Sequence, residues 1–113
     1  MSVTIYHNPR CSMSRQTLEL LEKKGVKPTV IEYLETPPSA AELKRILQML
    51  GMTPRQLLRK KEAQEAGLDD PELTGEALIG KMVANPAVIE RPIVIKGSKA
   101  ALGRPPENAL KIL

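Results

Sequence analysis

The sequence predicts an α/β fold with a mixed sheet of about four strands. Two β-branched runs near the N-terminus flank one helical pattern, and two short strand patterns joined by a tight turn precede the C-terminus. The stretch between these halves has helical patterns only, so we expect an all-helical insertion at roughly residues 39–86. Because 113 residues suit one compact core, we expect a single domain over residues 1–113.

The N-terminal half has a strand–helix–strand order. Residues 3–6 form an apolar strand pattern that ends at the turn pair Asn8-Pro9. A helical pattern of leucines follows from Ser12 and ends at Gly25, a typical residue just past a helix end. Residues 29–33 are β-branched and form the second strand pattern. Such a unit predicts two parallel strands joined by a right-handed crossover.

The middle of the chain carries three helix start signals. Ser39 and Glu42 have the form of a capping box, and the helix that they open ends at Gly51. The pair Thr53-Pro54 begins a short helix, followed by a run rich in basic residues up to residue 61. Thr74 caps another helix, which runs to about residue 85, where a proline follows.

The C-terminal half has a strand–strand–helix order. Residues 93–95 form a buried strand pattern, residues 96–99 a tight turn, and residues 100–102 its antiparallel partner. Residues 103–107 open a final helix that runs through Leu113. The complete order is that of a thioredoxin-like fold with a helical insertion between its two halves.

Composition excludes several classes of protein. The formal charge is only +4, and Tyr6 and Tyr33 are the sole aromatic residues, so we expect no nucleic-acid binding. The sequence has no apolar run of about 20 residues and no secretory-signal pattern, so we expect no membrane span. One cysteine and one histidine cannot form a disulfide framework or a zinc site. We therefore expect a cytoplasmic monomer without a bound metal.

The single cysteine, Cys11, follows the first strand and precedes the first helix. Backbone N–H groups and the positive end of a helix stabilise a thiolate at such a point. Ser14 stands where a dithiol enzyme would have its second cysteine. Arg10 and Arg15 flank the thiol, and each either lowers its pKa further or points into solvent. We interpret Cys11 as a nucleophile and not as a small buried hydrophobic residue.

Five segments together resemble the ArsC-type arsenate reductase family, which has a thioredoxin-like fold. They cover nearly the whole chain: His7–Arg15, Tyr33–Pro38, Leu57–Lys60, Glu90–Val94 and Gly103–Glu107. The resemblance implies that Cys11 attacks arsenate and that Arg59, Arg91 and Arg104 bind the oxyanion. It also implies glutathione as co-substrate and glutaredoxin as partner, with no bound cofactor.

The loop around the cysteine supplies supporting residues. Successive N–H groups from Asn8 to Ser14 can form an anion-binding nest at the helix start. Ser12 and Ser14 are candidate helix caps. Ser14 could instead donate a hydrogen bond to the thiolate. Arg15 adds positive charge beside the loop. His7 either orients the loop, assists proton transfer, or is a satisfied histidine at a strand end.

The Arg91-Pro92 bond is the remaining structural expectation. The resemblance implies a cis bond at Pro92, opposite the active cysteine. The alternative is an ordinary trans proline at the start of an edge strand.

Three functions remain open from the sequence. The first is an arsenate reductase, and the second is a glutathione-dependent thiol–disulfide oxidoreductase of the same fold. The third is a redox-responsive transcription regulator, which is disfavoured because Ser14 replaces the second cysteine of a disulfide switch. In either enzyme an external thiol is required, since one cysteine cannot resolve its own mixed disulfide.

Overall fold

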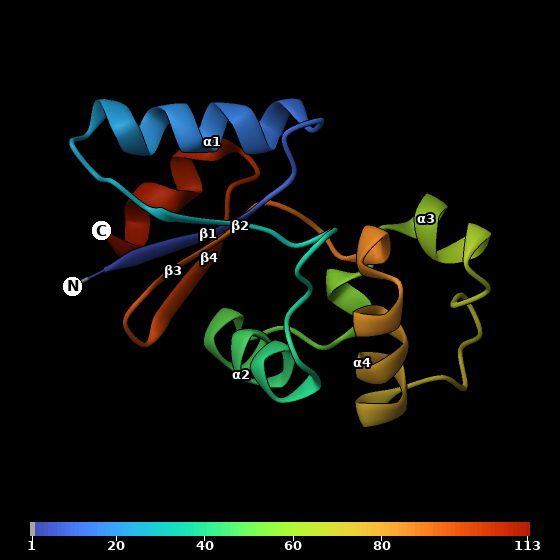
Figure 1. The fold of residues 1–113 in the computed structure, drawn as a ribbon. Coiled ribbons are helices and arrows are strands. Elements are labelled where there is room, and N and C mark those ends of the chain that lie inside the picture. Colours follow the sequence, from blue (N-terminus) through green and yellow to red (C-terminus); the bar gives the residue numbers. More distant parts are fainter. Residues whose placement is uncertain (1) are drawn as a thin grey trace. The chain divides into compact units, whose positions relative to one another are not determined.

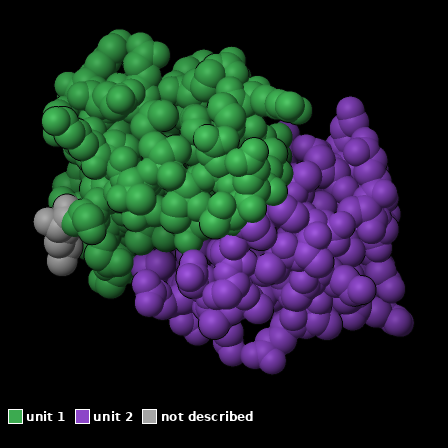
Figure 2. All heavy atoms as spheres, viewed as in Figure 1, with its two compact units in different colours: residues 1–36, 91–113 green, residues 37–90 purple. Residues whose placement is uncertain are grey.

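The computed structural model describes residues 2–113 and contains two compact units, which Figure 2 shows in different colours. The first unit holds the described residues up to Thr36 together with Arg91–Leu113. The second unit, Pro37–Glu90, contains the whole of the predicted helical insertion. That the two units act as one domain stays a prediction.

The first unit is a mixed four-stranded sheet with two helices. Its strands have the order β2-β1-β3-β4, with β1 parallel to β2 and antiparallel to β3, and β3 antiparallel to β4. This confirms the fold class and the parallel strand–helix–strand unit. The elements are β1 (Val3–His7), α1 (Ser12–Lys23), β2 (Thr29–Glu32), β3 (Ile93–Lys96), β4 (Lys99–Leu102) and the 3₁₀ helix η3 (Pro106–Ile112).

One face of this sheet carries the core of the first unit. Ile5 in β1 pairs with Val94 in β3, and both are fully buried, so apolar side chains line up across the two central strands. Helices α1 and η3 lie side by side against this face (Figure 1). The cluster that they bury consists of Val3, Ile5, Leu21, Val94 and Ala109.

Local signals explain where α1 ends and where η3 begins. Gly25 has φ +78°, and the N–H groups of Gly25 and Val26 bond the carbonyls of Glu22 and Leu21, which caps the C-terminus of α1. The sequence predicts that the last helix opens at Gly103, whereas in the structure it begins at Pro106. Gly103 instead donates its N–H to the carbonyl of Pro92, which keeps this residue out of the helix.

The second unit is entirely helical, as predicted. Its apolar core packs α2 against α4, and the buried side chains there are Leu43, Ile46 and Leu47 with Leu78, Ile79 and Met82. Its elements are α2 (Ala40–Leu50), the 3₁₀ turn η1 (Arg55–Leu57), α3 (Lys60–Glu65), α4 (Gly75–Ala84) and the 3₁₀ turn η2 (Pro86–Val88).

The capping residues of the second unit act largely as expected. The hydroxyl of Ser39 accepts a hydrogen bond from the N–H of Glu42 at 3.1 Å, and Gly51 ends α2 with φ +67°. Thr53 and Gln56 form a reciprocal pair, since each side chain accepts from the other's N–H, at 3.3 and 2.9 Å.

Helix α4 ends at Ala84, just before Pro86, as predicted, and Pro86 then begins the 3₁₀ turn η2. Two details of the second unit differ from the prediction. Thr74 precedes α4, but its side chain makes no capping hydrogen bond. Helix α3 was not expected: it has six residues and only Ala63 is buried, so it shows no apolar periodicity. No helix in the described part of the chain has the length and apolarity that a membrane span requires.

Candidate active site

Cys11 occupies the N-cap position of α1 with extended backbone angles (φ −92°, ψ 123°), and it is partly exposed. Its N–H donates to the carbonyl of Asn8, and its carbonyl accepts from the N–H of Arg15, both at 3.0 Å. These bonds hold the sulfur at the open first turn of the helix, where backbone N–H groups have no partner within the helix.

The pKa of the Cys11 thiol lies below its ordinary value. Burial raises this pKa, but the N–H of Ser14, the guanidinium of Arg91 and the N–H of Met13 together lower it by more. The helix start expected from the sequence therefore stabilises the thiolate, but the arginine that contributes is Arg91 and not the flanking Arg10 or Arg15.

A buried hydrogen-bond chain fixes the loop before Cys11. The hydroxyl oxygen of Ser14 accepts from the N–H of Asn8 at 3.0 Å and lies 2.6 Å from Nδ1 of His7. This short bond joins the hydroxyl of Ser14 directly to the imidazole of His7, and the tautomer of the ring sets which of the two groups donates. His7 is the last residue of β1, and Ser14 lies in the first turn of α1, so the chain ties the strand to the helix across the loop.

The surroundings of His7 favour its neutral form. Burial lowers its pKa; the charge of Glu32 acts in the opposite direction, and that of Arg15 adds to the lowering. His7 is therefore hydrogen-bonded at the strand end and linked to the loop through Ser14, while a part in proton transfer stays a prediction. Ser14 bonds His7 and Asn8 and is not a helix cap, because the N-cap is Cys11 itself.

The other loop residues lie nearer to solvent. Ser12 is the exposed first residue of α1 and does not occupy the cap position. The side chain of Arg15 donates to the carbonyl of Pro9 at 2.8 Å and so braces the loop from outside. The backbone N–H of Arg10 bonds the side-chain oxygen of Asn8 at 3.0 Å, which forms a tight turn before the cysteine.

Two of the three predicted arginines lie beside the thiol. Nη1 of Arg104 is 4.0 Å from Sγ of Cys11 and donates to the carbonyl of Arg91 at 3.2 Å. The carbonyl of Arg104 in turn accepts from the amide of Asn108 at 3.0 Å. Two guanidinium groups and the helix start thus give this end of the first unit a concentrated positive potential, suited to a tetrahedral oxyanion.

The structure places Arg59 in the second unit, between two carboxylates. Its Nε bonds Glu62 at 2.7 Å and its Nη1 bonds Glu90 at 2.6 Å. Burial lowers the pKa of Arg59, but the two carboxylates raise it by more, so the group stays charged. Its predicted contact with an oxyanion stays a prediction.

The Arg91–Pro92 peptide bond is cis, the isomer implied by the resemblance. A second cis bond, Arg104–Pro105, was not anticipated from the sequence.

Thr17 and Gly103 also support the site, and sequence reasoning missed both. The hydroxyl of Thr17 lies 2.8 Å from the carbonyl of Met13 and 3.3 Å from that of Gly103. A Cβ on Gly103 would lie 2.8 Å from Cγ of Pro92 and 2.8 Å from Cγ2 of Thr17, so only glycine fits without a shift. Gly103 stands at the start of the segment Gly103–Glu107 that carries the family resemblance, which was the signal for its position though not for its contact with Thr17.

Within residues 2–113, no group of three or more His, Cys, Asp or Glu side chains is arranged to hold a metal ion.

Comparison with known proteins identifies the family. The ArsC family model matches residues 6–112. An Escherichia coli K12 protein described as uncharacterized protein YfgD is 54% identical, over 98% of this chain and 96% of its own length. An arsenate reductase of Haemophilus influenzae is 47% identical over 100% of both chains. The solved structure of an arsenate reductase from Vibrio cholerae has a TM-score of 0.94 at 52% identity and covers 100% of this chain and 98% of its own. The chain therefore has a thioredoxin-like fold and belongs to the ArsC family.

Proposed function

We propose that this protein is an arsenate reductase in which the Cys11 thiolate attacks arsenate. The observation that carries the proposal is a single thiol of lowered pKa with the guanidinium groups of Arg91 and Arg104 beside it. Membership of the ArsC family and relatives named arsenate reductase at 44–47% identity support the same substrate.

In the first step a sulfur–arsenic bond replaces an arsenic–oxygen bond. The thiolate attacks dihydrogen arsenate, one proton is taken up, and one water leaves, which gives a monoanionic thioester of As(V) on Cys11. Two anions must meet for this to occur, so the arginines lower the barrier by neutralising the oxyanion. The resemblance adds Arg59 as a third oxyanion-binding residue, and we keep it in the proposal.

In the second step glutathione attacks the sulfur of Cys11. The electron pair of the sulfur–arsenic bond passes to arsenic, which is reduced from As(V) to As(III) and leaves as arsenite after taking up protons. Cys11 is left in a mixed disulfide with glutathione. Glutaredoxin then removes the glutathionyl group, because the chain has no second cysteine. The proposal places the reaction in the cytoplasm, where glutathione is kept reduced, with the chain acting as a monomer.

The test is turnover with purified components. Arsenate, glutathione and glutaredoxin should give steady arsenite formation with the wild-type protein and none with Cys11→Ser. A wild-type protein that is inactive on arsenate, yet reduces a glutathione mixed disulfide, would instead be the thiol–disulfide oxidoreductase that the sequence left open.

A further inference from the structure

The second unit contains a cavity whose lining residues have no assigned role in the proposed chemistry. It has a volume of about 480 Å³, within the range typical of small-molecule sites. Seven residues line it: Arg55, Gln56, Leu58, Lys60, Ala63, Gln64 and Asp69. All seven lie between residues 55 and 69, so the second unit alone forms the cavity.

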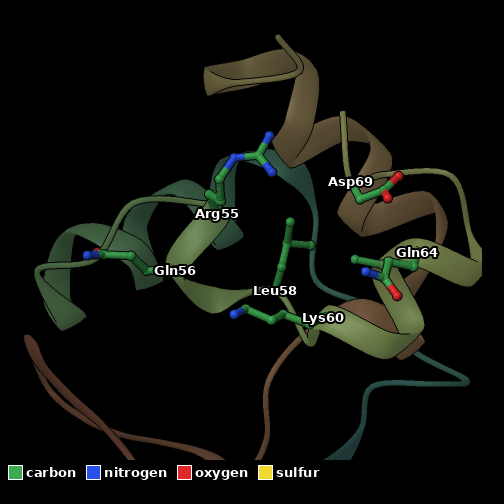
Figure 3. Close-up of a pocket in the computed structure, with 7 residues that line it drawn as sticks. Arg55, Gln56, Leu58, Lys60, Gln64 and Asp69 are labelled. Atoms are coloured by element: carbon green, nitrogen blue, oxygen red, sulfur yellow. The ribbon is translucent and has the colours of Figure 1, made fainter. Parts of the chain in front are cut away.

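Side chains of both charges line this cavity. Figure 3 shows Leu58 in the middle, Arg55 above it, Lys60 below it, and Gln64 and Asp69 to its right. In the described part of the chain, the side chains of Lys60 and Asp69 form no ion pair or hydrogen bond. A cation and an anion that share a cavity without pairing are both available to a ligand.

The guanidinium of Arg55 is fixed in place yet keeps donors for a ligand. Its Nη2 donates to the carbonyls of Asp70 and Leu73, at 2.7 and 2.6 Å. Nε and Nη1 take no part in these bonds and have further N–H groups. A carboxylate beside Arg55 would therefore meet an oriented guanidinium, and the ammonium of Lys60 adds positive charge to the same cavity.

Backbone hydrogen bonds also hold the floor of the cavity. Leu58 forms an antiparallel β-bridge with Ile89. Next to it, the N–H of Arg59 donates a hydrogen bond to the carbonyl of Val88 at 2.8 Å. The carbonyl of the buried Ala63 accepts a hydrogen bond from the N–H of Leu68 at 2.8 Å, just after the C-terminal end of α3. The apolar floor is thus formed before any ligand binds, which limits the entropy cost of binding.

We propose that this cavity binds a peptide-like zwitterion. The ligand's carboxylate lies toward Arg55 and Lys60, its ammonium group toward Asp69, and its short chain over Leu58 and Ala63. The side-chain amides of Gln56 and Gln64 are suited to the peptide groups of such a chain. Glutathione has this chemistry, and the choice of glutathione as the ligand rests on the proposed function.

The test uses a probe that cannot react with the thiol. The ¹⁵N-labelled Cys11→Ser protein is titrated with S-methylglutathione, and with glycylglycine in a parallel experiment, while amide chemical shifts are followed. We expect saturable shifts concentrated at residues 55–69. Lys60→Gln and Asp69→Asn should each weaken binding about two- to fivefold, the range for exposed ion pairs. Lys61→Gln and Glu65→Gln remove neighbouring exposed charges outside the cavity lining and should leave the affinity unchanged.

Binding of either peptide, weakened by the Lys60 and Asp69 variants, supports the site. Tighter binding of S-methylglutathione than of glycylglycine would identify glutathione as the ligand, and the reverse would indicate a short peptide. The absence of saturable shifts with both peptides would overturn the inference, as would equal losses in the control variants. Because this readout needs no turnover, a protein that binds the peptide but does not reduce arsenate would contradict the proposed function alone.

Discussion

Arg91→Met tests the electrostatic account of the Cys11 thiolate. The variant keeps a side chain of similar length but removes the guanidinium that hydrogen-bonds and attracts the thiolate. A hydrogen bond to a charged group contributes about 1.5–3 kcal/mol when it is shielded. Cys11 is partly exposed, so solvent screening reduces this to about 1 kcal/mol. That free energy corresponds to about a fivefold lower thiolate fraction at any pH below the thiol pKa.

The assay is the rate of alkylation by iodoacetamide at a pH at least one unit below the measured thiol pKa of the wild-type protein, where the rate follows the thiolate fraction. We expect about a fivefold slower reaction for Arg91→Met, with the rate still above that of the unfolded chain, because the N–H groups of Ser14 and Met13 remain. Arg10→Met is the matched control, since Arg10 is exposed and has no part in lowering the Cys11 pKa. An unchanged rate in Arg91→Met, or an equal loss in the control, would refute the reasoning.

Three further predictions concern stability. Ser14→Ala leaves a buried imidazole and a backbone N–H without their shared partner, so the free energy of unfolding in urea should fall by about 1–3 kcal/mol. The control Ser12→Ala changes an exposed serine and should cost less than about 0.5 kcal/mol. Equal effects would contradict the role of the buried hydrogen bonds of Ser14. Burial lowers the pKa of His7 in the folded protein, so the folded state binds a proton less readily than the unfolded state. The stability that neutral His7 contributes is therefore complete above the ordinary histidine pKa and is lost as the pH falls from that value through the lower pKa of the folded protein. The free energy of unfolding should thus drop between pH 7 and 5, with a smaller slope in His7→Gln, and an identical slope in that variant would exclude His7 as the cause. Glu90→Gln removes a partly buried ion pair and should cost about 1 kcal/mol in the same assay, whereas a cost as large for the exposed Glu65→Gln would indicate a general charge effect.

The parts of the fold that depend on neighbouring residues could be predicted from the sequence. Gly25 and Gly51 end helices because their missing Cβ permits positive φ, and Ser39 starts one because its hydroxyl reaches an N–H three residues on. The position of Cys11 between a strand and a helix was also a local signal. These features depend on a few adjacent residues, so they are visible in a linear pattern.

The features that were missed depend on residues far apart in the sequence. Thr17 and Gly103 are 86 positions apart, and their contact exists only after α1 packs beside the C-terminal segment. Glu90 lies 31 positions from the arginine that it pairs with in the structure. Helix α3 has too few apolar residues to show a period, so it forms because of its surroundings.

The roles of the arginines show the same limit in the candidate site. The motifs named Arg91 and Arg104, and the structure brings both to the thiol. No sequence pattern indicated that Arg59 would form ion pairs with two carboxylates, because the fold determines which charged side chains come close to one another.

Single turnover without glutaredoxin tests the central claim most directly. Reduced protein is mixed with glutathione, with and without arsenate, and intact-protein and peptide mass spectrometry follow Cys11 while released arsenite is measured. The account predicts a glutathionyl group on Cys11 that forms only with arsenate, together with one arsenite per modified protein. An adduct that forms equally without arsenate, or arsenite released while Cys11 stays unmodified, would contradict it.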